Sequence, residues 1–73
     1  MALTEVKSDV TGTVWKIETK AGDKVAEDDD LMIIESMKME IPVPAPEAGT
    51  VTEVLVAEEE PVAEGQVVAI IDT

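Results

Sequence analysis

Hydrophobic and polar residues alternate along much of this chain with the period of two that is typical of β-strands. In residues 12–19, Ile17 and Thr19 fall on one face and Lys16 and Glu18 on the other. Residues 50–56 repeat this alternation with valines opposite Glu53 and Leu55. Residues 31–34 and 67–71 are continuous apolar runs, short enough to favour buried strands over helices. The pattern therefore predicts short strands and no convincing helix.

Turn-forming residues separate these runs, as expected for strands connected by tight turns. The turn signals lie at residues 8–9, 21–23, 28–29 and 64–65. Prolines at positions 42, 44, 46 and 61 argue against a helix in the second half and indicate strand edges or bends.

The chain matches itself when it is shifted by 37 positions. Residues 12–14 fall on 49–51, residues 25–27 fall on 62–64, and the isoleucine pair 33–34 falls on 70–71. Two copies are too few for a repeat array, so the match predicts two halves packed with pseudo-twofold symmetry. We expect one all-β domain over residues 1–73, built as two small sheets or a flattened barrel. The repeat also places residue 38 at the tip of a hairpin that joins the halves, and the chain ends at the equivalent place.

Composition narrows the possible functions. The chain has 73 residues and no cysteine or histidine, which excludes disulfides, a thiol nucleophile and an imidazole base. With 17 acidic and 5 basic residues its net charge is −12, so neither a nucleic acid nor an anionic membrane surface is an expected partner. We find no signal peptide and no membrane-spanning stretch, and we expect a cytoplasmic protein. So small a domain is not expected to hold a catalytic cleft.

One hexapeptide stands out from the rest of the sequence. It runs from Glu35 to Glu40 and places Lys38 between two methionines, with Ser36 before them. Methionine normally fills core gaps and lysine belongs in water, so Met37, Lys38 and Met39 cannot all be buried or all be comfortably exposed. At an exposed hairpin tip, such a group is expected to be read by another macromolecule or to carry a chemical group.

The segment from Glu35 to Met39 closely resembles the Glu-Ala-Met-Lys-Met signature of biotinyl domains, the carrier modules of biotin-dependent carboxylases. The likeness extends over nearly the whole chain, including residues 12–14, 21–25, 45–51 and 64–66. It is closest to the small free-standing biotin/lipoyl attachment proteins. The resemblance implies a flattened eight-stranded β-barrel, or barrel-sandwich hybrid, of two four-stranded sheets with the lysine at a hairpin tip.

The resemblance also implies a function. A biotin protein ligase would join biotin to Lys38, reading Met37 and Met39 at its sides, with Glu35, Ser36 and Glu40 as the hairpin context. A biotin carboxylase would then load a carboxyl group and a carboxyltransferase would remove it, while the domain itself supplies no catalytic group. The other four lysines lack methionine neighbours, and two of them are expected on or beside strands.

Two alternatives remain. A lipoyl carrier would have the same fold, although lipoyl domains usually flank their lysine with Asp and Ala. An unmodified acidic β-module that only binds partners would leave Lys38 unchanged. Three departures from the family also carry expectations. Ser36 replaces the usual alanine, and Asp28 and Glu59 replace turn glycines, so that the turn at Glu59 is expected to be reshaped. Separately, Trp15 is expected to be a packing residue rather than a cofactor platform.

Overall fold

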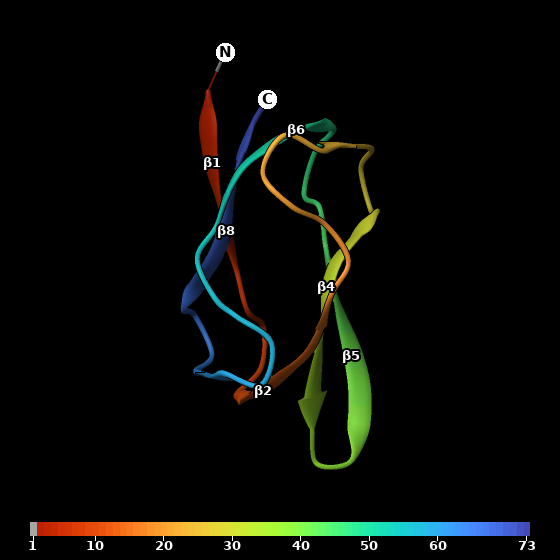
Figure 1. Ribbon diagram of the computed structural model, residues 1–73, viewed down its shortest axis with the longest axis vertical. Helices are drawn as coiled ribbons and strands as arrows, with labels where there is room; N and C mark the ends of the chain where they lie inside the picture. The colour runs from red at the N-terminus through yellow and green to blue at the C-terminus, as the bar shows by residue number, and fades with distance from the viewer. Residues whose placement is uncertain (1) are drawn as a thin grey trace.

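Eight β-strands form two antiparallel four-stranded sheets in the computed structural model, which describes residues 2–73 (Figure 1). The strand order is β1-β8-β6-β3 in one sheet and β5-β4-β2-β7 in the other. The strands are β1 (Leu3–Lys7), β2 (Gly12–Ile17), β3 (Lys24–Val25), β4 (Asp30–Ser36), β5 (Met39–Pro44), β6 (Gly49–Val54), β7 (Pro61–Val62) and β8 (Val67–Asp72). The domain measures 36 × 17 × 17 Å, and the predicted all-β fold of two four-stranded sheets is confirmed.

The backbone obeys the predicted pseudo-twofold symmetry down to single hydrogen bonds. The Gly22 amide donates to the Val51 carbonyl at 2.7 Å, and 37 positions on the Glu59 amide donates to the Val14 carbonyl at 2.6 Å. The Asp28 amide bonds to Ala45, as the Gly65 amide bonds to Ser8. Each strand of one sheet therefore has its counterpart in the other, with β1 equivalent to β5 and β4 equivalent to β8.

The core lies between the two sheets and draws equally on both halves. Its members alternate with exposed residues along the strands, as the period of two requires. Val14 and Val51, and likewise Ile34 and Ile71, are fully buried pseudo-equivalent pairs. The continuous apolar runs of β4 and β8 are buried, as predicted, and add Leu31, Met32, Val68 and Ala69 to the core. With neither disulfide nor metal-binding cluster in residues 2–73, packing of this core carries the stability of the fold.

The prolines lie at edges, as predicted. Strand β5 is an edge strand, and its register alternates between residues bonded to β4 and residues facing away. The Ala45 amide donates to the Asp29 carbonyl, so the amides of residues 41, 43 and 45 face β4. Pro42 and Pro44 take the alternate positions that face away, where an amide hydrogen would have no partner. Pro61 lies in β7, the edge strand on the other side of the same sheet.

The turn at Glu59 is not reshaped, contrary to the expectation. Glu59 adopts a left-handed φ of 73°, close to that of a glycine in this position, and Asp28 does the same at 71°. The hydrogen bonds around Glu59 match those around Gly22, so the tertiary contacts impose the geometry on an unsuited residue.

Trp15 lies outside the buried core. Its side chain remains 48% exposed on the outer face of its sheet.

Candidate functional site

The β4–β5 hairpin carries the predicted lysine at its tip. Ser36 faces Met39 in the closing pair, so Met37 and Lys38 form a two-residue loop. Both residues have positive φ, 51° for Met37 and 65° for Lys38, which is the geometry of a type I′ turn. This turn normally uses Asn-Gly, and β-carbons make it strained for other residues. Strained backbone of this kind clusters at functional sites, which makes the Met37–Lys38 turn the candidate site.

The tip projects its side chains into solvent. Met37 is 92% exposed and Met39 64% exposed, and the Lys38 side chain is exposed between them. Met39 shares the inward parity of Val43, but it gains little burial because the barrel ends before it. Two large apolar groups in water beside an amine form a surface that favours contact with another protein.

Ser36 anchors the base of this turn. Its hydroxyl donates to the Thr11 carbonyl oxygen at 2.9 Å, just beyond the last paired residues of β2 and β4, Thr13 and Glu35. The Thr11 hydroxyl in turn accepts a hydrogen bond from the Glu64 amide at 3.0 Å. The Ser36 hydroxyl therefore points away from the lysine and ties the hairpin to the barrel. Thr11 was not among the residues predicted from sequence. The one signal that could have identified it is a break in the internal repeat, where alanine occupies the equivalent position, 48.

Glu35 and Glu40 form the rung below the turn. They are directly paired across the two strands and are both exposed. Like charges in opposite positions repel each other, so this pair does not stabilise the hairpin. The pair makes the base of the hairpin that carries Lys38 acidic.

The chain ends lie at the far end of the molecule from the hairpin (Figure 1). Ala2 and Thr73 exchange two backbone hydrogen bonds of 3.1 and 2.8 Å, and they are the pseudo-equivalents of Met39 and Ser36. The Met37–Lys38 turn thus bridges one end of the pseudo-symmetric barrel, while the same gap at the other end holds the termini, as predicted. A chain continuing from either terminus would leave Lys38 unobstructed.

Exposure alone does not set Lys38 apart from the other lysines. Lys7, Lys16, Lys20 and Lys24 are all exposed, and three of them lie within strands rather than the two expected on or beside strands. Only Lys38 among the five has a positive φ and lies at a hairpin tip. Backbone geometry and the methionine neighbours are therefore what distinguish it.

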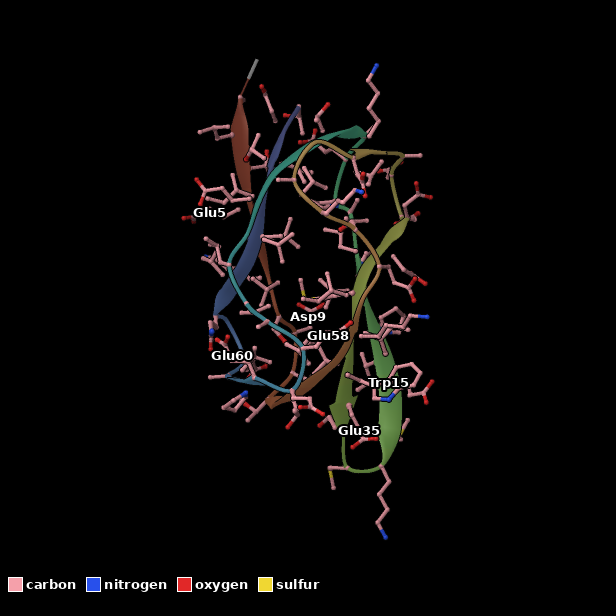
Figure 2. All side chains as sticks on the ribbon, viewed as in Figure 1. Glu5, Asp9, Trp15, Glu35, Glu58 and Glu60 are labelled. Carbon is pink, nitrogen blue, oxygen red and sulfur yellow. The ribbon has the colours of Figure 1, made fainter. Side chains whose placement is uncertain are left out.

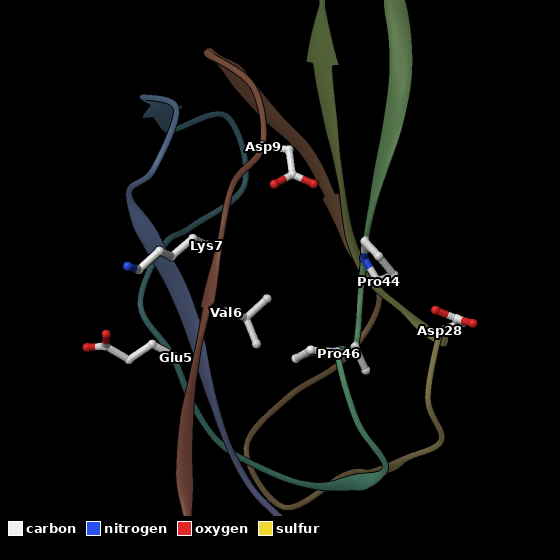
Figure 3. Close-up of a pocket in the computed structure, with 8 residues that line it drawn as sticks. Glu5, Val6, Lys7, Asp9, Asp28, Pro44 and Pro46 are labelled. Carbon is white, nitrogen blue, oxygen red and sulfur yellow. The ribbon is translucent and has the colours of Figure 1, made fainter.

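A pocket lies at mid-length, where the edge strands β1 and β5 approach each other (Figure 3). Its volume is about 410 Å³. It is lined by Glu5, Val6, Lys7, Asp9, Asp28, Pro44, Ala45 and Pro46. The hairpin tip takes no part in it.

The described residues hold neither a cluster of three or more possible metal ligands nor a helix that could cross a membrane. Within residues 2–73, no group of three or more carboxylates lies close enough together to bind a metal ion. The same residues include no helix long and apolar enough to cross a membrane.

Comparison with known proteins identifies the family. The family model described as "Biotin-requiring enzyme" matches residues 3–71. The biotin/lipoyl attachment protein of Bacillus subtilis is 44% identical over 62 residues, which are 85% of this chain and 85% of that protein. The biotinylated protein TB7.3 homolog of Mycobacterium leprae is 36% identical over 67 residues, 92% of this chain and 94% of that one.

The solved structures agree. The urea carboxylase of Kluyveromyces lactis superimposes with a TM-score of 0.93 and 35% identity, over 99% of this chain but 6% of that one. The chain thus spans most of the small relatives and a minor part of the large carboxylases. It belongs to the biotin/lipoyl attachment family.

Proposed function

We propose that this domain is a biotin carboxyl carrier: Lys38 is biotinylated and shuttles a carboxyl group between the active sites of a biotin-dependent carboxylase. The observation that carries the proposal is the strained Met37–Lys38 turn, which presents one amine at the end of a rigid hairpin. The attachment proteins and carboxylases among the relatives support it.

The residues present suit covalent attachment. The Lys38 side chain is exposed in the two-residue loop at the tip of the hairpin, where a ligase can reach it. Its amine would attack the activated carboxyl group of biotin, lose a proton and form an amide as the activating group leaves. This reaction removes the lysine charge and adds a long flexible arm. Bound biotin supplies the ureido nitrogen that accepts and releases a carboxyl group.

The chain's own contribution is to tether the biotin arm and to direct it. Tethering makes each delivery effectively intramolecular, which replaces diffusion by a high local concentration. The rigid sheet under the turn directs the arm along the long axis, away from the chain ends. The partners of this cycle are a biotin protein ligase, a biotin carboxylase and a carboxyltransferase. The proposal also implies a cytoplasmic location, where the ATP that these enzymes use is available.

A lipoyl carrier is the second candidate because the relatives include a protein named for both groups. The methionines flanking Lys38 favour biotin, because lipoyl domains usually have Asp and Ala there.

Intact-mass measurement tests the assignment. The protein co-expressed with a biotin protein ligase is expected to gain the mass of one biotinyl group. The Lys38→Arg variant should gain none, and Lys20→Arg, which alters another exposed lysine, should be labelled like the wild type. A lipoyl mass, or label that persists in Lys38→Arg, would overturn the proposal.

A further inference from the structure

Trp15 is the only aromatic residue of the chain, and it lies half-exposed on the flank of the lysine-bearing sheet. It occupies a β-bulge, where the register of β2 against β4 shifts between Val14 and Lys16. Val14 points into the core and is fully buried, so the bulge turns the indole outward. Figure 2 shows Trp15 and Glu35 in the half of the molecule that ends in the hairpin.

The strand register identifies the neighbours of Trp15 on the outer face. Ile33 is paired with Lys16 on one side and with Pro42 on the other, and paired residues point to the same face of a sheet. Ile33 alternates with the buried Ile34, so this row faces outward. Trp15, Ile33 and Pro42 therefore form an apolar patch. Glu35 and Glu40 lie two rungs nearer the hairpin tip, which makes them the next pair on this face, and they border the patch.

The other sheet lacks this patch, although it has the same backbone. Its bulge falls between Val51 and Glu53 and holds Thr52, the pseudo-equivalent of Trp15. Glu5 stands there in place of Pro42. The fold accordingly accepts a small polar residue in this bulge, with the Thr52 hydroxyl bonded to the Ile70 carbonyl at 3.0 Å. The equivalent bulge does not need an aromatic side chain, so the tryptophan on the lysine-bearing sheet calls for another explanation.

We propose that the Trp15 patch is a docking surface for the enzyme that modifies Lys38. This inference rests on the proposed function and identifies the part of the domain that a biotin protein ligase grips besides the hairpin. The complementary surface is an apolar cavity that receives the indole, bordered by arginine or lysine side chains that face Glu35 and Glu40. Tryptophan is enriched among the residues that dominate binding energy at such contacts.

The ligase fits this surface better than the later partners for a chemical reason. It meets the domain before any prosthetic group is present, so it must recognise the protein surface itself. It must also reject Lys16, which borders the patch on the same strand. A contact to Trp15, about three residues or ~10 Å along the sheet from the hairpin base, would fix the orientation in which only Lys38 reaches the active site.

Steady-state biotin transfer by a purified biotin protein ligase, with the carrier as varied substrate, tests the proposal. Trp15→Thr copies the residue that the opposite bulge accepts, and the fold is therefore retained. Its KM is expected to rise by about tenfold or more, the loss typical of a tryptophan at the centre of an interface. The kcat at saturating carrier should stay unchanged, and Trp15→Phe should restore part of the affinity. The wild-type KM should also rise with salt as the acidic border is screened.

Leu55→Thr is the matched control, since it removes an apolar side chain of similar exposure, 45%, from the residue that directly follows β6 of the other sheet. Its KM is expected to equal that of the wild type. An unchanged KM for Trp15→Thr, or equal losses in both variants, would refute the docking surface while leaving biotin attachment intact. Absence of biotin transfer to the wild type would instead refute the proposed function itself.

A direct contact can be observed without turnover. Fluorotryptophan incorporated into this chain gives a single fluorine resonance, because Trp15 is the only tryptophan. Addition of unlabelled ligase is expected to change its chemical shift as the indole leaves water. An unchanged shift at ligase concentrations that saturate the transfer reaction would contradict the proposal.

Discussion

The Ser36 hydroxyl donates a hydrogen bond of 2.9 Å to the Thr11 carbonyl and so ties the strained lysine turn to the neighbouring strand connection. Its pseudo-equivalent, Thr73, bonds to the Ala2 carbonyl within its own strand pair at 3.3 Å. Within residues 2–73, the hydroxyl at this position therefore ties its strand to a neighbouring strand connection only at the lysine end.

Removing this hydroxyl is expected to loosen the hairpin. Ser36→Ala should lower the free energy of unfolding by about 0.5–1.5 kcal/mol, the usual contribution of one hydrogen bond. Amide exchange should accelerate at Met37, Lys38 and Met39 more than in β6 or β8. Thr73→Ala serves as the control, because it alters the equivalent position without touching the turn. Uniform acceleration in both variants would show that Ser36 has no local role.

Glu59→Gly is expected to stabilise the protein. Glu59 holds a φ of 73°, and a left-handed conformation costs a residue with a β-carbon about 1–2 kcal/mol. Part of the gain is lost because glycine increases the freedom of the unfolded chain, which leaves a net gain of about 0.5–1 kcal/mol. Chemical denaturation measures the difference.

The reciprocal substitution provides the control. Gly22→Glu places a side chain at a φ of 98°, where no other atom lies within 4 Å of the added β-carbon. Any loss of stability therefore arises from the backbone alone. A stable Gly22→Glu protein would show that these turns do not depend on glycine.

Gly12→Ala is expected to destabilise the domain and distort the site together. A β-carbon at Gly12 would overlap the Glu35 carbonyl oxygen, on the strand that leads to the lysine turn. Relief of such a clash typically costs about 1–3 kcal/mol. Gly49→Ala produces the equivalent clash with Asp72 at the other end. Both variants should melt earlier, but only Gly12→Ala should also slow biotinylation at a temperature where both remain folded.

Salt is expected to stabilise the protein. The net charge of −12 on a domain of 73 residues produces self-repulsion, which is stronger in the compact state than in the unfolded chain. Raising the ionic strength from about 0.01 to 0.15 M shortens the screening length from roughly 30 to 8 Å, so the melting temperature should increase. Calorimetry at constant pH measures it. An unchanged or lower melting temperature would show that self-repulsion does not limit stability.

Much of the fold could be predicted from local pattern and the internal repeat. The alternation in residues 12–19 and 50–56 and the apolar runs at 31–34 and 67–71 identified β2, β6, β4 and β8. The two-residue strands β3 and β7 were missed, because so short a segment has no period and forms only through its partner strand. The turn at Glu59 was predicted incorrectly since residue preference is a weaker effect than the hydrogen bonds that surround it.

The candidate site divides in the same way. The motif and the 37-residue offset alone located Lys38 at a hairpin tip, because both depend only on the order of residues. The Ser36–Thr11 link, the outward position of Trp15 and the pocket between β1 and β5 were decided by the tertiary structure. The link and the pocket join segments that are distant in sequence, and the position of Trp15 depends on a bulge. Contacts of this kind leave no periodic signal in the sequence. By itself, the sequence determined that this protein has two equivalent β halves joined at one lysine; only packing of the sheets decided which surfaces surround it.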